Sequence, residues 1–201
     1  MNNIILNKSI NHLNQFEEIK DLIEQYPVPK FSPSNNYYQA LAKSIIYQQL
    51  SGNAAKVIYS RFLNLFDGDT STPSEYLNID DFTLRGIGIS KQKISYIKNL
   101  SIFFIENQNR LDFTTYSNEQ ISSKLILIKG IGQWTIDMFM IFTLSRLDVL
   151  PVGDLAIKKA FKVIYSLKEL PSDSFMRSKA LKWKPYRSIA SRYLWMLAND
   201  S

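Results

Sequence analysis

Cysteine is absent from this chain of 201 residues, and histidine occurs once. The lack of cysteine excludes disulfides, thiolate zinc sites, iron–sulfur clusters and a cysteine nucleophile. A Ser-His-Asp triad would have to be built around His12, which lies in a polar helical pattern typical of a solvated surface residue. Cysteine-based catalysis is therefore excluded, and a Ser-His-Asp triad is confined to one position at which it is not expected.

Long apolar runs are missing as well. No stretch approaches the length of a membrane span, and the first residues, MNNIILNKSI, lack the apolar region of a signal peptide. We therefore expect a soluble intracellular protein without a membrane partner. Its location would be the cytoplasm or nucleoid of a bacterium or archaeon, or the nucleus of a eukaryote.

The composition is that of a globular protein, with 45% hydrophobic and 13% aromatic residues. The length supports one compact domain or two closely associated lobes. Basic residues number 24 and acidic residues 18, which gives a net charge of +6. This excess is compatible with a polyanionic partner such as nucleic acid, although many enzymes are also mildly basic.

Alternating strand patterns are not found, and helical periodicity dominates, so the sequence predicts an all-α fold. One amphipathic helix is expected at 10–26, followed by a proline-containing connector, YPVPKFSPSNN. Thr72 and Ser90 are placed to cap the helices that follow them. Further helices are expected at 38–46 and 54–65, on both sides of Gly130, after Asp154 and through SIASRYLWML near the end.

The stretch IKGIGQWTIDM contains a tight turn, Gly130-Ile131-Gly132, between two helices. Glycines permit a positive φ and leave no Cβ to block an approaching surface. The N–H groups of such a turn, with those of the next helix, can bind an anion such as a DNA phosphate without reading sequence. Lys129 would add positive charge there, with Lys91 and Lys93 as further candidates. The alternative is that the glycines only make a turn.

Four motifs carry a resemblance to a known family: SIIYQQLSGNAAKVIYSRF, IKGIGQWTIDMFMIF, DVLPVGDLAIKKAF and WKPYRSIASRYLW. Their order and spacing resemble the helix-hairpin-helix (HhH-GPD) DNA glycosylase superfamily. The closer resemblance is to its DNA-3-methyladenine glycosylase II branch, in a compact form without the N-terminal β-rich domain. This implies a single all-α domain with two helical lobes flanking a DNA-binding cleft.

The resemblance also implies boundaries within that domain. The middle lobe would comprise 36–120, and the second lobe 1–35 with 121–201. The second lobe would carry the hairpin, at about 121–143, and the catalytic loop, at 147–154. Because only the second glycine pair is followed by this loop, the similar LRGIGISKQKI at 84–94 is expected to form a structural turn.

The activity implied is that of a monofunctional glycosylase of base excision repair. Such an enzyme flips an alkylated purine, for example 3-methyladenine, out of double-stranded DNA and hydrolyses its N-glycosidic bond. An abasic site remains. We expect a monomer with no cofactor and no metal in the site.

Asp154 matches the catalytic aspartate of that family. A carboxylate near C1′ stabilises the oxocarbenium character that develops as the base departs, and it can orient water. Asp154 is also well placed as the N-cap of the next helix, and both roles are compatible. Asp148 and Arg187 are expected to be structural.

The resemblance places the base-binding pocket at Trp134 and Trp195, although both could instead be core residues. An electron-rich aromatic wall attracts electron-poor purines through stacking and cation–π contact. Met138 and Leu155 stand where some members carry tyrosine, which leaves the range of lesions open. Trp134 also stands where strand-cleaving relatives carry a lysine, so no Schiff base is expected there.

The turn YQQLSG matches the segment that fills the gap left by the flipped nucleotide. Gln49 is the closest match to the inserted residue, with Gln48 and Leu50 as neighbours. The alternative is that Gln48 and Gln49 only satisfy backbone groups at a helix end.

Two other functions would account for part of the sequence. A non-catalytic helix-hairpin-helix DNA-binding module would explain the charge and the hairpin, but not Asp154, Trp134 and Trp195 together. The other is a glycosylase for oxidised or mismatched bases. Its lyase version needs a lysine where this chain has Trp134, and its iron–sulfur version needs cysteines, which the chain lacks.

Overall fold

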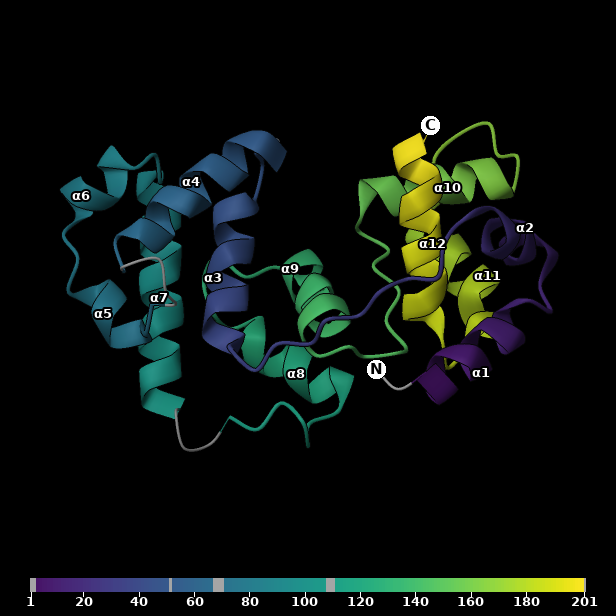
Figure 1. Cartoon of the computed structure of the whole chain (residues 1–201), viewed down its shortest axis with the longest axis horizontal. Helices are drawn as coiled ribbons and strands as arrows, with labels where there is room; N and C mark the ends of the chain where they lie inside the picture. The colour runs from purple at the N-terminus through teal and green to yellow at the C-terminus, as the bar shows by residue number, and fades with distance from the viewer. Residues whose placement is uncertain (1–2, 51, 67–70, 108–110, 201) are drawn as a thin grey trace. The chain divides into compact units, whose positions relative to one another are not determined.

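The computed structural model describes residues 3–50, 52–66, 71–107 and 111–200. In these ranges the chain forms helices and no strand, which confirms the all-α prediction (Figure 1). None of the described helices is long and apolar enough to cross a membrane. The chain divides into unit 1, residues 1–33 with 140–201, and unit 2, residues 34–139.

Unit 2 is built around the longest helix, α7, which contacts α3, α5 and α6, while α9 packs on α3 and α8 (Figure 1). The buried core of this unit includes apolar side chains from these helices, such as Leu41, Ile97 and Ile136. The helices are α3 (Tyr37–Tyr47), α4 (Gly52–Asn64), α5 (Pro73–Leu77), α6 (Asp81–Gly86), α7 (Lys91–Asn107), α8 (Asn118–Leu125) and α9 (Gln133–Met138).

Helix caps in unit 2 follow the sequence signals. Thr72 caps α5 in a capping box with Glu75, and Pro73 is the first helical residue. Before α7, the Ser90 hydroxyl accepts a hydrogen bond of 3.3 Å from the Lys93 N–H. Both predicted caps are confirmed.

Unit 1 has its core between α12 and the helices α10, α2 and α1 (Figure 1). Fully buried Trp183, Phe161 and Tyr193 form the bulk of that core. Its helices are α1 (Asn3–Leu13), α2 (Glu17–Gln25), α10 (Leu155–Ile164), α11 (Asp173–Lys179), the 3₁₀ helix η2 (Ala180–Trp183) and α12 (Arg187–Asp200); the π-helix η1 (Phe139–Thr143) leads into this unit from α9.

Two expectations for the N-terminal region are wrong. The single helix expected at 10–26 is broken into α1 and α2, because Phe16 adopts an extended conformation at the start of α2. His12, expected to be fully solvated, is only partly exposed. Its Nε2 lies 3.1 Å from the Lys182 carbonyl, and its ring packs edge-on against Phe16 and Tyr186.

The division into units differs from the predicted lobes in residues 121–139. These residues group with 34–120, because α9 packs on α3 and because Ile131 and Ile136 are buried. The Phe139 ring also packs against Phe113 and Tyr37. The hairpin therefore belongs to unit 2, whereas the loop that carries Asp154 belongs to unit 1.

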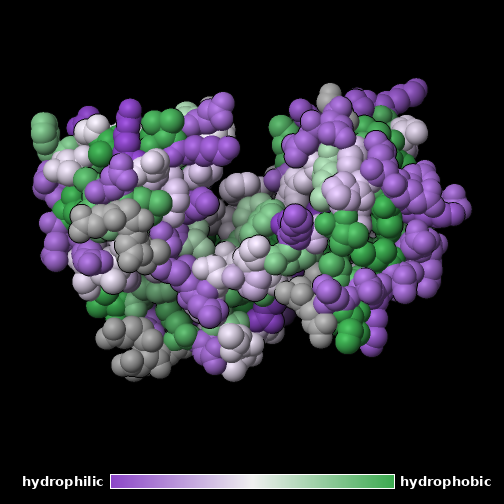
Figure 2. Space-filling view, in the orientation of Figure 1, coloured by the Kyte–Doolittle hydropathy of each residue, from purple (hydrophilic) through white to green (hydrophobic). Residues whose placement is uncertain are grey.

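Hydrophilic side chains cover much of the visible surface, with hydrophobic residues in small groups between them (Figure 2). This distribution is ordinary for a globular protein, whose surface always retains apolar atoms. Leu127, two residues before Lys129, is the most exposed apolar side chain near the hairpin, at 81%.

Gly130 should tolerate no side chain. Its φ is +105°, and an added Cβ would lie 2.1 Å from Tyr96 Cγ. We expect Gly130→Ala to lower the free energy of unfolding by about 2 kcal/mol or more, from left-handed strain and overlap. At Gly132 nothing lies within 4 Å of the added Cβ, so Gly132→Ala should cost about 1 kcal/mol or less. Urea unfolding of both variants measures the difference, and equal losses would contradict it.

Candidate functional site

The hairpin is a tight turn between α8 and α9. The Ile128 N–H donates to Leu125 O and the Ile131 N–H to Ile128 O, at 3.1 and 3.0 Å. Gly132 is exposed and caps α9 without a side-chain hydrogen bond. The first N–H groups of a helix have no intrahelical acceptor, so the backbone around Gly132 can donate to an anion.

The two Gly-Ile-Gly turns differ in backbone conformation. In the first turn the second glycine, Gly88, has a positive φ of +102°, and Gly86 is the last residue of α6. In the second turn the first glycine, Gly130, has the positive φ. Gly132 is the N-cap of α9. The sequence echo is thus not a structural repeat.

Residues predicted to bind the DNA backbone are placed unequally. Ile131 has its side chain buried and its N–H bonded within the turn, so it anchors the hairpin and has neither group to offer DNA. Lys129 has an exposed side chain, and its carbonyl accepts a hydrogen bond from Asn99. Gly132 and Lys129 therefore remain the candidates for contact with DNA.

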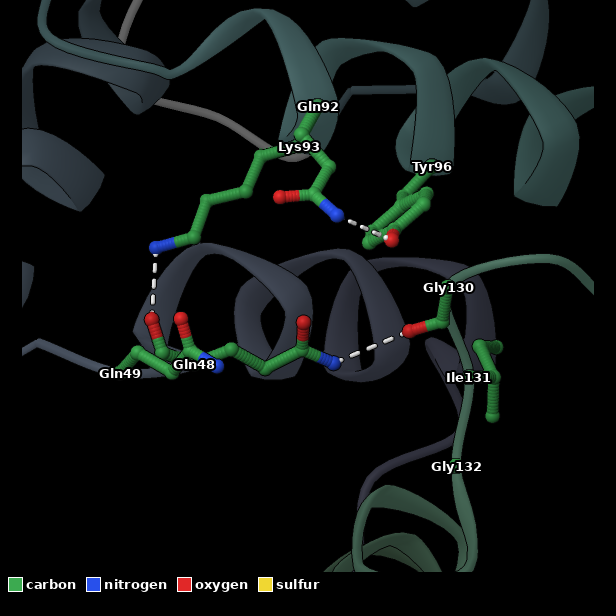
Figure 3. Close-up of a pocket in the computed structure, with 8 residues that line it drawn as sticks. All are labelled: Gln48, Gln49, Gln92, Lys93, Tyr96, Gly130, Ile131 and Gly132. Carbon is green, nitrogen blue, oxygen red and sulfur yellow. Dashed lines mark hydrogen bonds between the residues drawn. The ribbon is translucent and has the colours of Figure 1, made fainter.

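The predicted wedge turn follows the end of α3, and its Ser51 lies outside the described residues. Gln48 points back at the hairpin, and its Nε2 donates to Gly130 O at 3.0 Å (Figure 3). The same Nε2 also donates to Thr135 Oγ1 at 3.2 Å. Gln49 is exposed with a left-handed φ of 56°, and Leu50 is exposed as well. The Gln48 side chain is thus engaged within the protein, whereas Gln49 and Leu50 are exposed and can contact a binding partner.

Lys93 caps the carboxyl end of α3. Its Nζ donates to Ile46 O and to Gln48 O, each at 2.7 Å, and burial lowers its pKa. A cation is stabilised at this end of a helix by the carbonyls that lack an intrahelical partner. The ammonium that was a candidate for phosphate binding is therefore engaged in holding the wedge turn.

The wedge turn and the hairpin line one pocket of about 340 Å³ in unit 2 (Figure 3). Its other wall comes from α7, where Gln92 Nε2 donates to Tyr96 Oη at 2.6 Å. The lining also includes Lys93, Gln48 and Gln49, so it is largely polar. Two segments predicted from separate motifs to touch DNA thus meet in space.

Asp154 lies in unit 1 as the N-cap of α10. Its Oδ1 accepts hydrogen bonds from the Ile157 N–H at 3.0 Å and from Trp195 Nε1 at 3.1 Å. Asp154 is buried, and its backbone N–H donates to Pro151 O at 3.0 Å. The capping role is confirmed, and the bond from Trp195 is an additional constraint on the orientation of the carboxylate.

Trp195 is half-buried and stacks on Phe142, with ring centroids 5.3 Å apart and an interplanar angle of 34°. Phe142 is 42% exposed and Leu155, beside Asp154, is also exposed. Phe142 was missed in the sequence because helical periodicity gives no sign of the π-helix that turns it toward Trp195. Unit 1 therefore presents an aromatic pair next to a buried carboxylate.

Trp134 and Met138 lie one turn apart on α9 in unit 2. Trp134 is 39% exposed, which does not fit the alternative that it is a core residue. Asp137, between them, is buried and accepts a hydrogen bond of 2.8 Å from Gln133 Nε2. Asp137 is thus part of the packing of α9.

Arg187 and Asp148 form a two-pronged ion pair, with Nε 2.6 Å from Oδ1 and Nη2 2.9 Å from Oδ2. Beside it, the Ser188 hydroxyl accepts a hydrogen bond of 2.9 Å from the Val149 N–H. The start of α12 therefore holds the loop that leads to Asp154, which is the structural role predicted for Arg187 and Asp148.

A protein-family model described as "HhH-GPD superfamily base excision DNA repair protein" matches residues 42–185. This chain belongs to that superfamily. It is 30% identical over 197 residues to DNA-3-methyladenine glycosylase 1 of Schizosaccharomyces pombe, a match that covers 94% of this chain and 86% of the relative.

Solved structures of the superfamily agree with this fold. The 3-methyladenine DNA glycosylase of Schizosaccharomyces pombe in complex with abasic DNA matches with a TM-score of 0.84 at 30% identity, over 96% of this chain and 97% of that one. The DNA-3-methyladenine glycosidase of Bacillus halodurans matches with a TM-score of 0.82 at 36% identity, over 94% and 88%. The predicted family and HhH-GPD fold are confirmed.

The carbonyls held by Lys93 yield a prediction. Lys93→Met should leave Ile46 O and Gln48 O without this donor, and the free energy of unfolding should fall by about 1–3 kcal/mol. Lys91→Met, at an exposed position on the same helix, should change it by about 0.5 kcal/mol or less. Thermal unfolding compares the two variants. Indistinguishable stabilities would show that Lys93 does not hold the wedge turn.

Proposed function

We propose that this protein is a monofunctional DNA glycosylase that releases alkylated purines such as 3-methyladenine from double-stranded DNA. The observation that carries the proposal is the buried Asp154 carboxylate, oriented by Trp195 and by the start of α10 within a chain of the HhH-GPD superfamily. The names of the Schizosaccharomyces pombe and Bacillus halodurans relatives support this substrate class.

Binding would use the surface formed by the hairpin and the wedge turn of unit 2. Backbone N–H groups around Gly132, with the charge of Lys129, would hold a phosphate without reading sequence. Extruding a nucleotide costs a few kcal/mol of stacking and pairing. The exposed Gln49 and Leu50 would enter the space that the nucleotide leaves.

Asp154 would act on the sugar. As the purine departs, positive charge develops on the deoxyribose, and a fixed carboxylate stabilises that charge without reorganising. Asp154 can also accept a proton from the water that attacks C1′. Two N–H donors on Oδ1 keep the carboxylate in one orientation for both tasks.

Selection of the base would come from aromatic surface. Alkylated purines carry positive charge or are electron-poor, and such rings stack well on electron-rich aromatic faces. Trp195 and the exposed Phe142 supply such a surface beside Asp154. We further propose that the protein acts as a monomer at DNA inside the cell.

Replacement of the carboxylate tests the function directly. Asp154→Asn keeps an oxygen that can accept from Ile157 and Trp195, but it removes the charge. Release of 3-methyladenine from a defined duplex should fall by about 100-fold or more, while the affinity for DNA stays within a few-fold. Asp173→Asn, at an acid paired with Lys158 in the same unit, is the control. If Asp154→Asn releases the base at the wild-type rate, then Asp154 serves only as the N-cap of α10.

The reaction should leave the DNA strand intact. Trp134 offers no amine, so borohydride added during turnover should trap no enzyme–DNA adduct. The product strand should break only after heat or alkali, as gel analysis would show. Lys129 is the exposed amine nearest to the hairpin in sequence, and Lys129→Met is the variant to compare. A trapped adduct, or a strand cut at neutral pH, would refute direct hydrolysis.

A further inference from the structure

Arg192 on α12 occupies an unusual environment in unit 1. Its guanidinium carbon lies 4.7 Å from the ring centroid of Phe142 and 5.1 Å from that of Phe31. Nη2 donates to Lys30 O at 2.7 Å. Within the described ranges it forms no ion pair with a carboxylate, and burial lowers its pKa. Placing a cation there is unfavourable unless the contacts that it makes are needed.

Two aromatic residues connect Arg192 with Asp154. Phe142, whose ring lies beside the guanidinium, is also the stacking partner of Trp195. Trp195 then donates its indole N–H to Asp154 Oδ1 at 3.1 Å. Arg192 and Trp195 are three residues apart on α12 and so project from the same side of the helix.

The middle of this series is partly exposed, so the protein core does not enclose it. Phe142 is 42% exposed and sits in the π-helix η1, and Trp195 is only half-buried. Arg192 fixes Phe142 by stacking on it, and it fixes its own guanidinium through Lys30 O and Phe31. A planar guanidinium can stack on two rings while donating hydrogen bonds in its plane, which an ammonium group cannot do.

We propose that Arg192 is a positioning residue for base excision, acting through Phe142 and Trp195 on the orientation of Asp154. This inference rests on the proposed function, because it takes Asp154 as the carboxylate that faces the sugar. Small errors in the placement of a catalytic group reduce rates strongly, and a displacement of about 1 Å can cost about 100-fold.

The kinetic test measures base release in a single turnover with enzyme in saturating excess over a 3-methyladenine duplex. Arg192→Gln should lower the rate constant about tenfold and leave the Kd for DNA within about twofold. Arg192→Lys should be nearly as slow, because it keeps the charge but loses the planar stack. Lys159→Gln, at an exposed residue on α10, should behave as wild type and controls for the lost charge.

A spectroscopic test follows the indole N–H signals of the three tryptophans by ¹H–¹⁵N correlation, with Trp195 assigned from Trp195→Phe. In Arg192→Gln the Trp195 signal should shift, because its bond to Asp154 changes. The Trp183 signal should stay in place, since Trp183 donates to Glu18 in the same unit at 3.3 Å and reports on intact folding. Phe142→Leu, which removes the ring between Arg192 and Trp195, should shift the Trp195 signal in the same way.

The outcomes separate this inference from the proposed function. Wild-type release by Asp154→Asn would remove the proposed function itself. An inactive Asp154→Asn beside a fully active Arg192→Gln with an unmoved Trp195 signal would overturn only the role of Arg192. A higher Kd in Arg192→Gln that Arg192→Lys restores would also overturn it, since that result identifies a direct phosphate contact.

Discussion

The left-handed backbone of Gly130 is the constraint on which the hairpin and the wedge turn of unit 2 depend. Because Gly130 has no Cβ, Tyr96 of α7 packs directly against the hairpin. The carbonyl of the same residue accepts the Gln48 amide, which connects the end of α3 to the turn. Two helices remote in sequence from the hairpin are thus placed against one residue, and the pocket between wedge turn and hairpin follows from their approach.

This arrangement affects how a phosphate would be held. Lys93 lines the pocket, but its ammonium is bonded to carbonyls at the end of α3, where it stabilises the wedge turn. Binding at the hairpin would then rely on backbone N–H groups and on Lys129. Backbone donors are fixed by the fold, so they hold phosphates of any sequence with little loss of side-chain freedom.

The sequence was sufficient for the fold class, most helix positions, the caps and the family, because periodicity and capping are local signals and the motifs are specific. It did not predict the break at Phe16, where the backbone is extended, or the bond of His12 to the Lys182 carbonyl, 170 positions away. The sequence did not predict the role of Phe142, because a π-helix changes which side chains share a helix face. Gln48 and Gln49 are adjacent, and only the structure separates the one that bonds to the hairpin from the one that is exposed.

In unit 1 a single helix determines where the acidic loop lies. The first turn of α12 holds the loop through the pair of Arg187 with Asp148 and through the Ser188 hydroxyl, and two turns later Trp195 bonds to Asp154. A loop attached at both ends to one rigid helix cannot shift its carboxylate without distorting that helix. Irregular backbone can therefore carry a group that needs fixed geometry, because its position is set by a regular element packed into the core.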